Sequence, residues 1–390
     1  MLFKAGVVTL IVLHGLVHLM GPAKAFALVE LPQLTAPVSR AMGVAWLVAA
    51  VAMGATALLF ALSVRSWWIV GLAAVVLSQF VILSSWGDAK FGTLVNVILL
   101  ALVLYGFLSG GPFSFAAEYR HAISSRLADA PSSQPFLTEA DLAHLPEPVR
   151  RYIRLTGSVG RPQVHHIRAT WRGRIRAGPD EPWMPFTAEQ VNVVDEPARF
   201  FLMDARKSGL PVDVYHAFQD GAASMRVRLL SMIPVADARG PEMTRAETVT
   251  LLNDLALLAP AALARSSPDA APTAAEGTGG RAGTRPRLRW EAIDARSARA
   301  WYSSGPHEVS AVLEFDEAGE LVDFVSDDRL AASSDGRSFE SWRWSTPVSH
   351  YRSFGDLRLM SRGSALWHSP EGTYAYIEME LLELETNGVR

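Results

Sequence analysis

The sequence contains no cysteine in its 390 residues. This absence excludes disulfides, iron–sulfur clusters, thiolate metal sites and a cysteine nucleophile. Common catalytic motifs are missing as well, because there is no Gly-x-Ser-x-Gly, Ser-x-x-Lys, His-Glu-x-x-His or Walker loop. Histidine and carboxylate side chains are therefore the strong ligands left for any metal, and the sequence leaves open whether the protein is an enzyme.

Charged residues are scarce in the first 112 residues, which carry five basic and two acidic side chains. The rest of the chain holds 31 of the 36 basic and 37 of the 39 acidic residues, a net charge of −6. The chain thus divides into an apolar third and a soluble part large enough to bury its own core. We expect a transmembrane bundle at 1–112, a linker at 113–137 and a soluble domain at 138–390.

Four apolar runs in the first third are each close to the roughly 20 residues that a membrane-spanning helix needs. The runs are 3–20, 41–63, 67–86 and 91–109. The first is interpreted as a retained helix because three more follow it and it has no small-residue cleavage motif. The sequence therefore predicts an integral protein of the bacterial plasma membrane, with four helices.

Basic residues beside the spans indicate the orientation of the bundle. With the N-terminus inside, the cytoplasmic flanks hold Lys4, Arg65, Arg120 and Arg126, and the outer flanks hold Lys24, Arg40 and Lys90. Four against three slightly favours a cytoplasmic soluble domain and leaves the side undecided.

Polar residues inside the spans form an expected intramembrane layer. The layer consists of His14, His18, Gln79, Asp88, Lys90 and Asn96. His14 and His18 share a helix face, and helix rise places His14, Gln79 and Asn96 at similar depth below one membrane face. Asp88 is the expected partner of His18. The layer either binds a metal, haem, quinone or lipid headgroup or supplies interhelical hydrogen bonds; the second reading is favoured because no third strong ligand is evident.

After residue 165 the hydrophobic pattern changes to period two, which is typical of half-buried strands. Strands are expected near 166–176, 186–194, 198–205, 225–233, 287–293, 297–303, 307–315, 320–326, 357–367 and 373–383, with a helix from Pro241 to about Pro260. Residues 266–286 are rich in Ala, Gly, Pro and Thr and are expected to form a disordered loop. The predicted fold class is α+β: a large, curled, half-barrel-like antiparallel sheet with one or two packed helices.

Aromatic side chains are the main candidates for a ligand cavity in this domain. The candidates are Trp183, Tyr215, Trp290, Trp342, Trp344 and Tyr351. Asp213 and His216 flank Tyr215 and are candidates for the same pocket. Glu247 lies near the start of the predicted helix, where an acid is expected to interact with the helix dipole.

Arginines alternate along the outer face of the expected strands. They are Arg168, Arg172, Arg174 and Arg176, with Arg226 and Arg228 on another strand. This face either contacts anionic lipid headgroups, at about 1 kcal/mol per cation, or is a solvated face paired with nearby acids. Nucleic acid is not expected as a partner because the domain is net acidic and has no recognised module.

Four strings carry a resemblance to a known family. They are Leu145–Gly157, Trp183–Gln190, Trp290–Asp294 and Phe315–Gly319. They resemble an uncharacterised bacterial membrane-protein family, a domain of unknown function, over roughly 138–385, and residues 1–112 resemble the four-helix membrane segment found on some members. The layout is also similar to LolA-type lipoprotein-carrier folds, half-barrels that hold acyl chains.

The resemblance implies no activity, so the functional expectation comes from the layout. The first hypothesis is a membrane-anchored, non-enzymatic protein that binds a lipid or other apolar ligand in its β-rich domain. The alternatives are a membrane redox, metal or transport protein that uses the intramembrane layer, and a structural or assembly protein without a ligand. Membrane lipid is the expected partner, whereas cofactor, metal and oligomeric state are not predicted.

Overall fold

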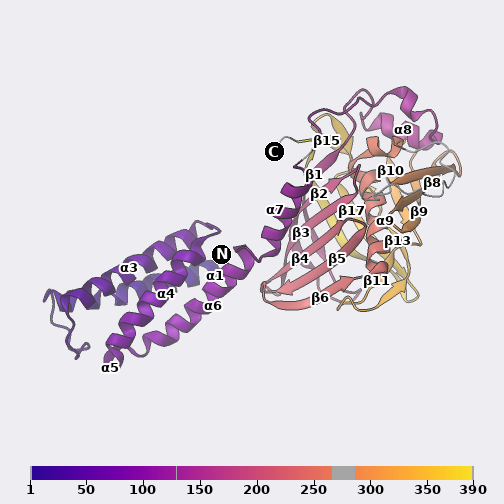
Figure 1. Cartoon of the computed structure of the whole chain (residues 1–390). Helices are drawn as coiled ribbons and strands as arrows, with labels where there is room; N and C mark the ends of the chain where they lie inside the picture. The colour runs from indigo at the N-terminus through magenta and orange to yellow at the C-terminus, as the bar shows by residue number, and fades with distance from the viewer. Residues whose placement is uncertain (1, 129, 266–285, 389–390) are drawn as a thin grey trace, which may run out of the picture. The chain divides into compact units, whose positions relative to one another are not determined.

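The computed structural model describes residues 2–128, 130–265 and 286–388. The chain forms two compact units, residues 1–118 and 119–390 (Figure 1), and each is described by itself. The loop expected at 266–286 lies outside the described residues except for its last position.

The first unit consists of apolar helices. They are α1 (Leu2–Val17), α2 (Met20–Ala25), α3 (Arg40–Ala61), α4 (Trp67–Ser84), α5 (Trp86–Ala89) and α6 (Gly92–Gly110). Four stretches of the described helices are long and apolar enough to cross a membrane: Lys4–Ala25, Arg40–Ala61, Trp67–Ser84 and Gly92–Arg126. The structure thus has the four long apolar helices that the sequence predicts, and their place in a membrane stays a prediction.

Close helix contacts in this unit depend on small residues. At Gly21 an added Cβ would lie 2.2 Å from Cγ of Trp46, so α2 approaches α3 only because position 21 has no side chain. Ile11, Met53 and Leu99 pack in the core between the helices with at most 3% of their surface exposed.

The second unit is built on a 14-stranded antiparallel sheet. Its first strands are β1 (His166–Ile175), β2 (Met184–Val193), β3 (Ala198–Lys207), β4 (Leu210–Gln219), β5 (Ala222–Leu229) and β6 (Ile233–Arg239). The later ones are β7 (Arg287–Ala292), β8 (Ser297–Ser304), β9 (His307–Phe315), β10 (Leu321–Ser326), β13 (Arg343–Ser345), β14 (Val348–Ser349), β17 (Arg362–Ser369) and β18 (Gly372–Thr386). The spatial order is β6-β5-β4-β3-β2-β1-β18-β17-β13-β10-β9-β8-β7, with β14 added on β17.

Shorter elements complete this unit. They are α8 (Glu147–Leu155), the 3₁₀ helices at Glu139–Leu142 and Pro260–Ala264, and the hairpins β11 (Leu330–Ala332) with β12 (Phe339–Ser341) and β15 (Arg352–Phe354) with β16 (Leu357–Leu359). The predicted Asp316–Gly319 turn joins β9 to β10, with Gly319 at a φ of 93°.

The sheet curls around one helix, α9 (Pro241–Leu258). From Met243 to Leu258 every side chain except that of Arg245 is buried, as expected of a helix with protein on all sides. It contacts β5 and β6 near one end of the strand order and β8, β9 and β10 near the other (Figure 1). Because β6 and β7 remain edge strands, the sheet does not close, which confirms the predicted half-barrel-like α+β fold.

The opposite, outer face of the sheet is partly covered by α7 (Phe115–Arg126). Tyr119 packs edge-on against Tyr215 of β4 with ring centroids 6.4 Å apart, and Arg126 forms ion pairs with Glu196 and Asp220. Much of the stretch expected to be a linker is thus a helix whose apolar face is buried.

Three strand predictions were wrong. The strand β4 was missed because both of its faces are buried, which hides the alternation: Tyr215 faces outward and is 1% exposed. The run 225–233 does not form one strand, since the chain turns after Leu229 and returns as β6. The run 357–367 is divided between β16 and β17.

Candidate functional site

A buried charge network joins α9 to the inner face of the sheet. Arg199 of β3 donates from Nε to Oδ2 of Asp254 at 2.7 Å and from Nη1 to Oε2 of Glu247 at 3.2 Å. The acids are seven residues apart on α9, two turns along one face. Their side chains are 9% and 1% exposed, so the network is sealed from solvent.

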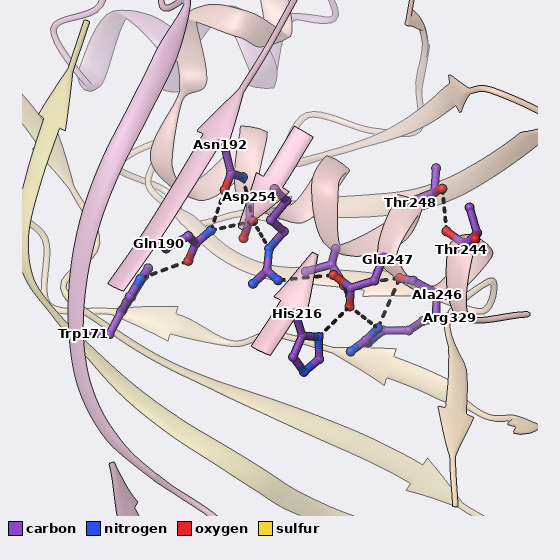
Figure 2. Close-up of polar contacts among 12 residues, drawn as sticks. Trp171, Gln190, Asn192, His216, Thr244, Ala246, Glu247, Thr248, Asp254 and Arg329 are labelled. Atoms are coloured by element: carbon purple, nitrogen blue, oxygen red, sulfur yellow. Dashed lines mark hydrogen bonds and ion pairs between the residues drawn. The ribbon is translucent and has the colours of Figure 1, made fainter. Parts of the chain in front are cut away.

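Amide side chains donate further hydrogen bonds to the Asp254 carboxylate (Figure 2). Gln190 and Asn192 of β2 donate to its Oδ2 at 2.7 and 2.8 Å. The indole of Trp171 on β1 donates to Oε1 of Gln190 at 3.0 Å. Residues 190 and 192 share the inner face because side chains alternate along a strand.

Glu247 has its own set of partners. His216 lies 3.4 Å from its Oε1 through Nδ1, and Arg329 lies 4.0 Å from the same oxygen and donates to the carbonyl of Ala246 at 3.2 Å (Figure 2). The Arg329 guanidinium also stacks over the Trp344 ring at 4.7 Å. His216 does face the interior, whereas Asp213 accepts a hydrogen bond from Ser231 beside the β5–β6 turn.

The charges in this network balance. Burial alone raises the pKa of Glu247, but Arg199, His216 and Arg329 outweigh it and hold that pKa well below its usual range. For Asp254, burial dominates and raises the pKa despite Arg199 and Asn192. Two arginines thus face two carboxylates in a sealed interior, an arrangement that fixes α9 to the sheet and leaves no access for a substrate.

The sequence-based reading of Glu247 as a partner of the helix dipole was wrong, because its carboxylate points into the sheet. Arg199 and Asp254 were not singled out at all. A usable signal was present: Glu247 and Asp254 interrupt an otherwise apolar helix face with a spacing of two turns.

An open groove of about 1060 Å³ lies along β1, β2, β3, β17 and β18. Trp171 faces inward towards α9, so the alternation places Arg172 and Arg174 on the outer face. Their cross-strand partners on β2 and β18, including Thr187, line the same groove. The groove is therefore on the face of the sheet that α9 does not occupy.

Arginines dominate the walls of the groove. Arg172 pairs with Glu380 and Arg174 pairs with Glu378, each at 2.7 Å. Arg206 and Arg362 also line it, and within the described part of the chain their side chains make no hydrogen bond or ion pair. The four arginines face three acids, because Asp204 lines the groove as well, which leaves one excess positive charge.

Apolar groups line the same groove. Pro185, opposite Arg174, and Pro347 contribute to its wall, whereas the side chains of Phe186, Val348 and Met379 pack in or against the inner core. The pairing of Arg172 and Arg174 with glutamates agrees with the solvated-face reading of these residues, whereas Arg206 and Arg362 keep cationic groups available.

The aromatic candidates do not gather in one pocket. Trp183 lies beside the groove, under the guanidinium groups of Arg174 and Arg176, each 4.6 Å from its ring centroid. Tyr215 packs under α7, as described above. Trp290, on the edge strand β7, donates to the carbonyl of Leu263 at 3.4 Å.

The remaining aromatic candidates belong to the inner core. Trp344 donates to the hydroxyl of Tyr376 at 3.2 Å, and Trp342 packs edge-on against Trp367, with ring centroids 6.2 Å apart. Tyr351 donates to the carbonyl of Leu321 at 3.0 Å. Of the six aromatic candidates, only Trp342 and Trp344 lie close together. Both contact Trp367, which is the cross-strand partner of Trp344.

In the first unit the structure brings His14, Gln79 and Asn96 together. Nε2 of His14 donates to Oδ1 of Asn96 at 3.0 Å, and Nδ2 of Asn96 donates to Oε1 of Gln79 at 3.0 Å. Ser78 donates to the same Asn96 oxygen at 2.9 Å, and Gln79 donates to Thr93 at 3.1 Å. Sequence reasoning missed Ser78 and Thr93, which are short side chains next to the residues that were noticed.

His18 lies beside this network rather than in it. Its Nδ1 donates to the His14 carbonyl at 2.8 Å, so the lone pair is on Nε2. Among the described residues, Nε2 of His18 and Nε1 of nearby Trp46 are buried without a hydrogen-bond partner.

Asp88 does not contact His18 but fastens the loop before α3. It accepts from the backbone N–H of Thr35 and of Ala36 at 2.6 and 3.0 Å, and these bonds lower its pKa. Lys90 lies 5.5 Å from the ring of Phe91. No group of three or more histidines and acids suited to a metal occurs in the described ranges.

Comparison with known proteins identifies the family. The model of a family of unknown function, DUF6544, matches residues 135–379, so the chain belongs to that family and the expected resemblance is confirmed. No curated protein matches the chain.

Two solved structures are similar to the chain, with low TM-scores and low sequence identity. One is a domain assigned to outer-membrane lipoprotein sorting from Vibrio parahaemolyticus, with 12% identity, a TM-score of 0.30, and coverage of 58% of this chain and 87% of the other. The second is a DUF1329 family protein from Desulfovibrio piger, with 10% identity, a TM-score of 0.33, and coverage of 62% and 93%. Overlap this low supports no functional inference.

Proposed function

We propose that this DUF6544 protein is a membrane-anchored binding protein, and that its β-rich unit holds a lipid or other apolar ligand that carries an anionic group. The groove on the outer face of the sheet carries the proposal. Its volume of about 1060 Å³ suits a ligand of acyl-chain size. Arg206 and Arg362 supply cations that form no ion pair within the described chain, although Arg362 lies opposite Glu380 across β17 and β18.

The inner side of the curled sheet is a poor place for such a ligand. The buried helix α9 fills it, and the Arg199 network crosses the space between α9 and the strands. Admitting a ligand there would separate buried charges from their partners, which costs several kcal/mol. The outer groove requires no such rearrangement.

The helices of the first unit serve as the anchor in this proposal. Their polar layer is made of neutral groups that already bond to one another, the interhelical arrangement common in membrane bundles. A redox or transport role would need a ligand or an ionisable relay, and the geometry of His14 and Asn96 favours neither. A cytoplasmic position for the β-rich unit stays a prediction of the flanking charges.

Of the aromatic candidates, Trp183 takes part in the proposed site. Its ring supports the guanidinium groups of Arg174 and Arg176 and thereby fixes one wall of the groove. We assign the other five to the scaffold, because their polar groups bond to the core or to neighbouring aromatic rings.

The test measures the lipid that stays bound to the full chain after purification in detergent, by native mass spectrometry and by lipid extraction. The parent chain is compared with a groove variant and a control variant. The variant Arg206→Ala/Arg362→Ala removes two cations at about 1 kcal/mol each, so anionic lipid retention should fall about 30-fold. The matched control is Arg296→Ala/Arg337→Ala, which removes two exposed arginines outside the groove. Equal lipid retention in both variants would assign the lipid to the spans and contradict the proposal.

A further inference from the structure

The turn from β5 to β6 exposes a run of four apolar residues. Met232, Ile233 and Val235 are 38%, 51% and 49% exposed, and Pro234 between them is exposed as well. Leu210, at the start of β4, is 47% exposed. We call these five residues the apolar tip. Single exposed apolar residues are ordinary on a protein surface, but an unbroken run of four is not.

The apolar tip is held in a defined conformation. Leu230 and Ser231 both have left-handed backbone geometry, with φ of 55° and 57°, which non-glycine residues adopt only when their surroundings enforce it. The N–H of Leu230 donates to the carbonyl of Pro211 at 2.9 Å, and Ser231 donates to Asp213. These bonds tie the β5–β6 turn to the neighbouring β3–β4 hairpin, so both hairpin ends present one surface.

Pairing with the edge strand of a second copy does not account for this surface. Pro234 has no N–H to donate to an added strand. Farther along β6, Gly336 of the β11–β12 hairpin lies against Ala238, close enough that an added Cβ would be 2.9 Å from Cβ of Ala238. Both features block an added strand along most of β6.

Basic side chains flank the apolar tip. Arg206 and Lys207 belong to the adjoining β3–β4 hairpin, and Arg228 lies opposite Pro234 across the strand pair. Lys207 forms a long, exposed ion pair with Glu181, at 4.0 Å. Protruding apolar side chains with cations around them are complementary to an anionic bilayer surface.

We propose that the apolar tip inserts into the headgroup region of the membrane in which the four helices of the same chain are anchored. This inference rests on the anchoring in the proposed function, which keeps a bilayer within reach of the β-rich unit, and Lys207 matches the anionic headgroups of that bilayer. The contact would hold the β-rich unit against the bilayer surface. It does not depend on what the groove binds.

The absence of cysteine allows a direct test with single-cysteine variants of the full chain. Ile233→Cys carries an environment-sensitive NBD fluorophore, and the chain is reconstituted in vesicles of phosphatidylcholine and phosphatidylglycerol in equal parts. The matched control is Glu317→Cys, a 94% exposed position in another turn of the same unit. We expect blue-shifted emission at 233, quenched by lipids with a nitroxide near the headgroup, and water-like, unquenched emission at 317.

Water-like emission at 233, equal to that at 317, would overturn the proposal. A blue shift at 233 without quenching by the nitroxide lipids would also overturn it, because a second copy of the chain would then cover the tip.

Replacing Lys207 tests the electrostatic part. Ile233→Cys/Lys207→Glu should lose at least half of the quenching in the mixed vesicles and little in pure phosphatidylcholine. The same double variant made with Arg337→Glu, an 86% exposed arginine outside the apolar tip, is expected to retain the quenching in both. Equal quenching in all variants and both lipids would remove the role of Lys207.

Discussion

The two units of this chain stabilise their polar interiors in opposite ways. Between the apolar helices of the first unit, the network of His14, Ser78, Gln79 and Asn96 contains no formal charge in its hydrogen-bonded form, and each donor meets a neutral acceptor. Inside the curled sheet, Arg199 is buried between two carboxylates. Hydrocarbon tolerates hydrogen bonds far better than ions, whereas a folded soluble core can hold ions whose partners are fixed.

The neutral network and the charged network therefore have different structural roles. The neutral layer joins α1, α4 and α6 with bonds of moderate strength. The charged network determines how α9 sits in the sheet, because Asp254 and Glu247 reach Arg199 in only one rotation of the helix.

The largest effect is expected for Arg199→Met, which leaves Glu247 and Asp254 buried without their shared cation. The free energy of unfolding of the β-rich unit should fall by about 3–5 kcal/mol. Chemical denaturation of the full chain, followed by tryptophan fluorescence, measures it. A loss below 1 kcal/mol would mean that water or other side chains solvate these acids.

A smaller effect is expected in the helical first unit for Asn96→Leu. The change removes the acceptor shared by His14 and Ser78 and the donor to Gln79, and interhelical bonds of this kind are worth about 1–2 kcal/mol at most. Steric-trap or detergent-titration unfolding would measure it. Asn96→Leu as damaging as Arg199→Met would break the contrast between the two interiors.

Asp323 shows what a partly buried acid does without a cation. Burial is the main cause that raises its pKa, from 3.8 to about 6. Its folded form therefore binds a proton more tightly than its unfolded form, and stability is lost as the pH rises from about 4 to about 6. Asp323→Asn should be more stable than the parent by about 1 kcal/mol at pH 7, after allowance for solvent screening, and equal to it at pH 4. Thermal unfolding of the variant and the parent at pH 4 and pH 7 measures this difference in stability. A stability difference that is the same at both pH values would contradict the raised pKa of Asp323.

The smallest effect is expected for Arg343→Met, the exposed counterpart of the first variant. Arg343 pairs with both oxygens of Asp327, at 2.9 and 3.2 Å, but the two side chains are 57% and 69% exposed. Its removal should cost at most about 0.5 kcal/mol in the same denaturation experiment. A cost near that of Arg199→Met would show that burial is not what separates the two pairs.

The network between the apolar helices could be predicted from the sequence more easily than the charged network inside the curled sheet, for a physical reason. The convergence of His14, Gln79 and Asn96 needs only helix rise and an up-and-down topology, both of which are local rules. The meeting of Arg199 with Asp254 depends on strand order, register and the rotation of α9, none of which is encoded in a short window. The strand β4 was missed for a related cause, since burial of both faces removes the pattern that identifies a strand.

The groove was the feature that the sequence predicted least well. Its arginines were noticed as an alternating face, but Arg206 and Arg362 come from strands that meet only through the pairing of β1 with β18.

Photo-cross-linking tests the central claim, a lipid site in the outer groove, most directly. The full chain is reconstituted with diazirine-bearing phosphatidylglycerol, irradiated and mapped by peptide mass spectrometry. Cross-links are expected on the peptides that contain Pro185 and Pro347, in addition to the spans, and these two should be lost in Arg206→Ala/Arg362→Ala. Cross-links confined to the spans, or reaching α9 instead of the groove, would contradict it.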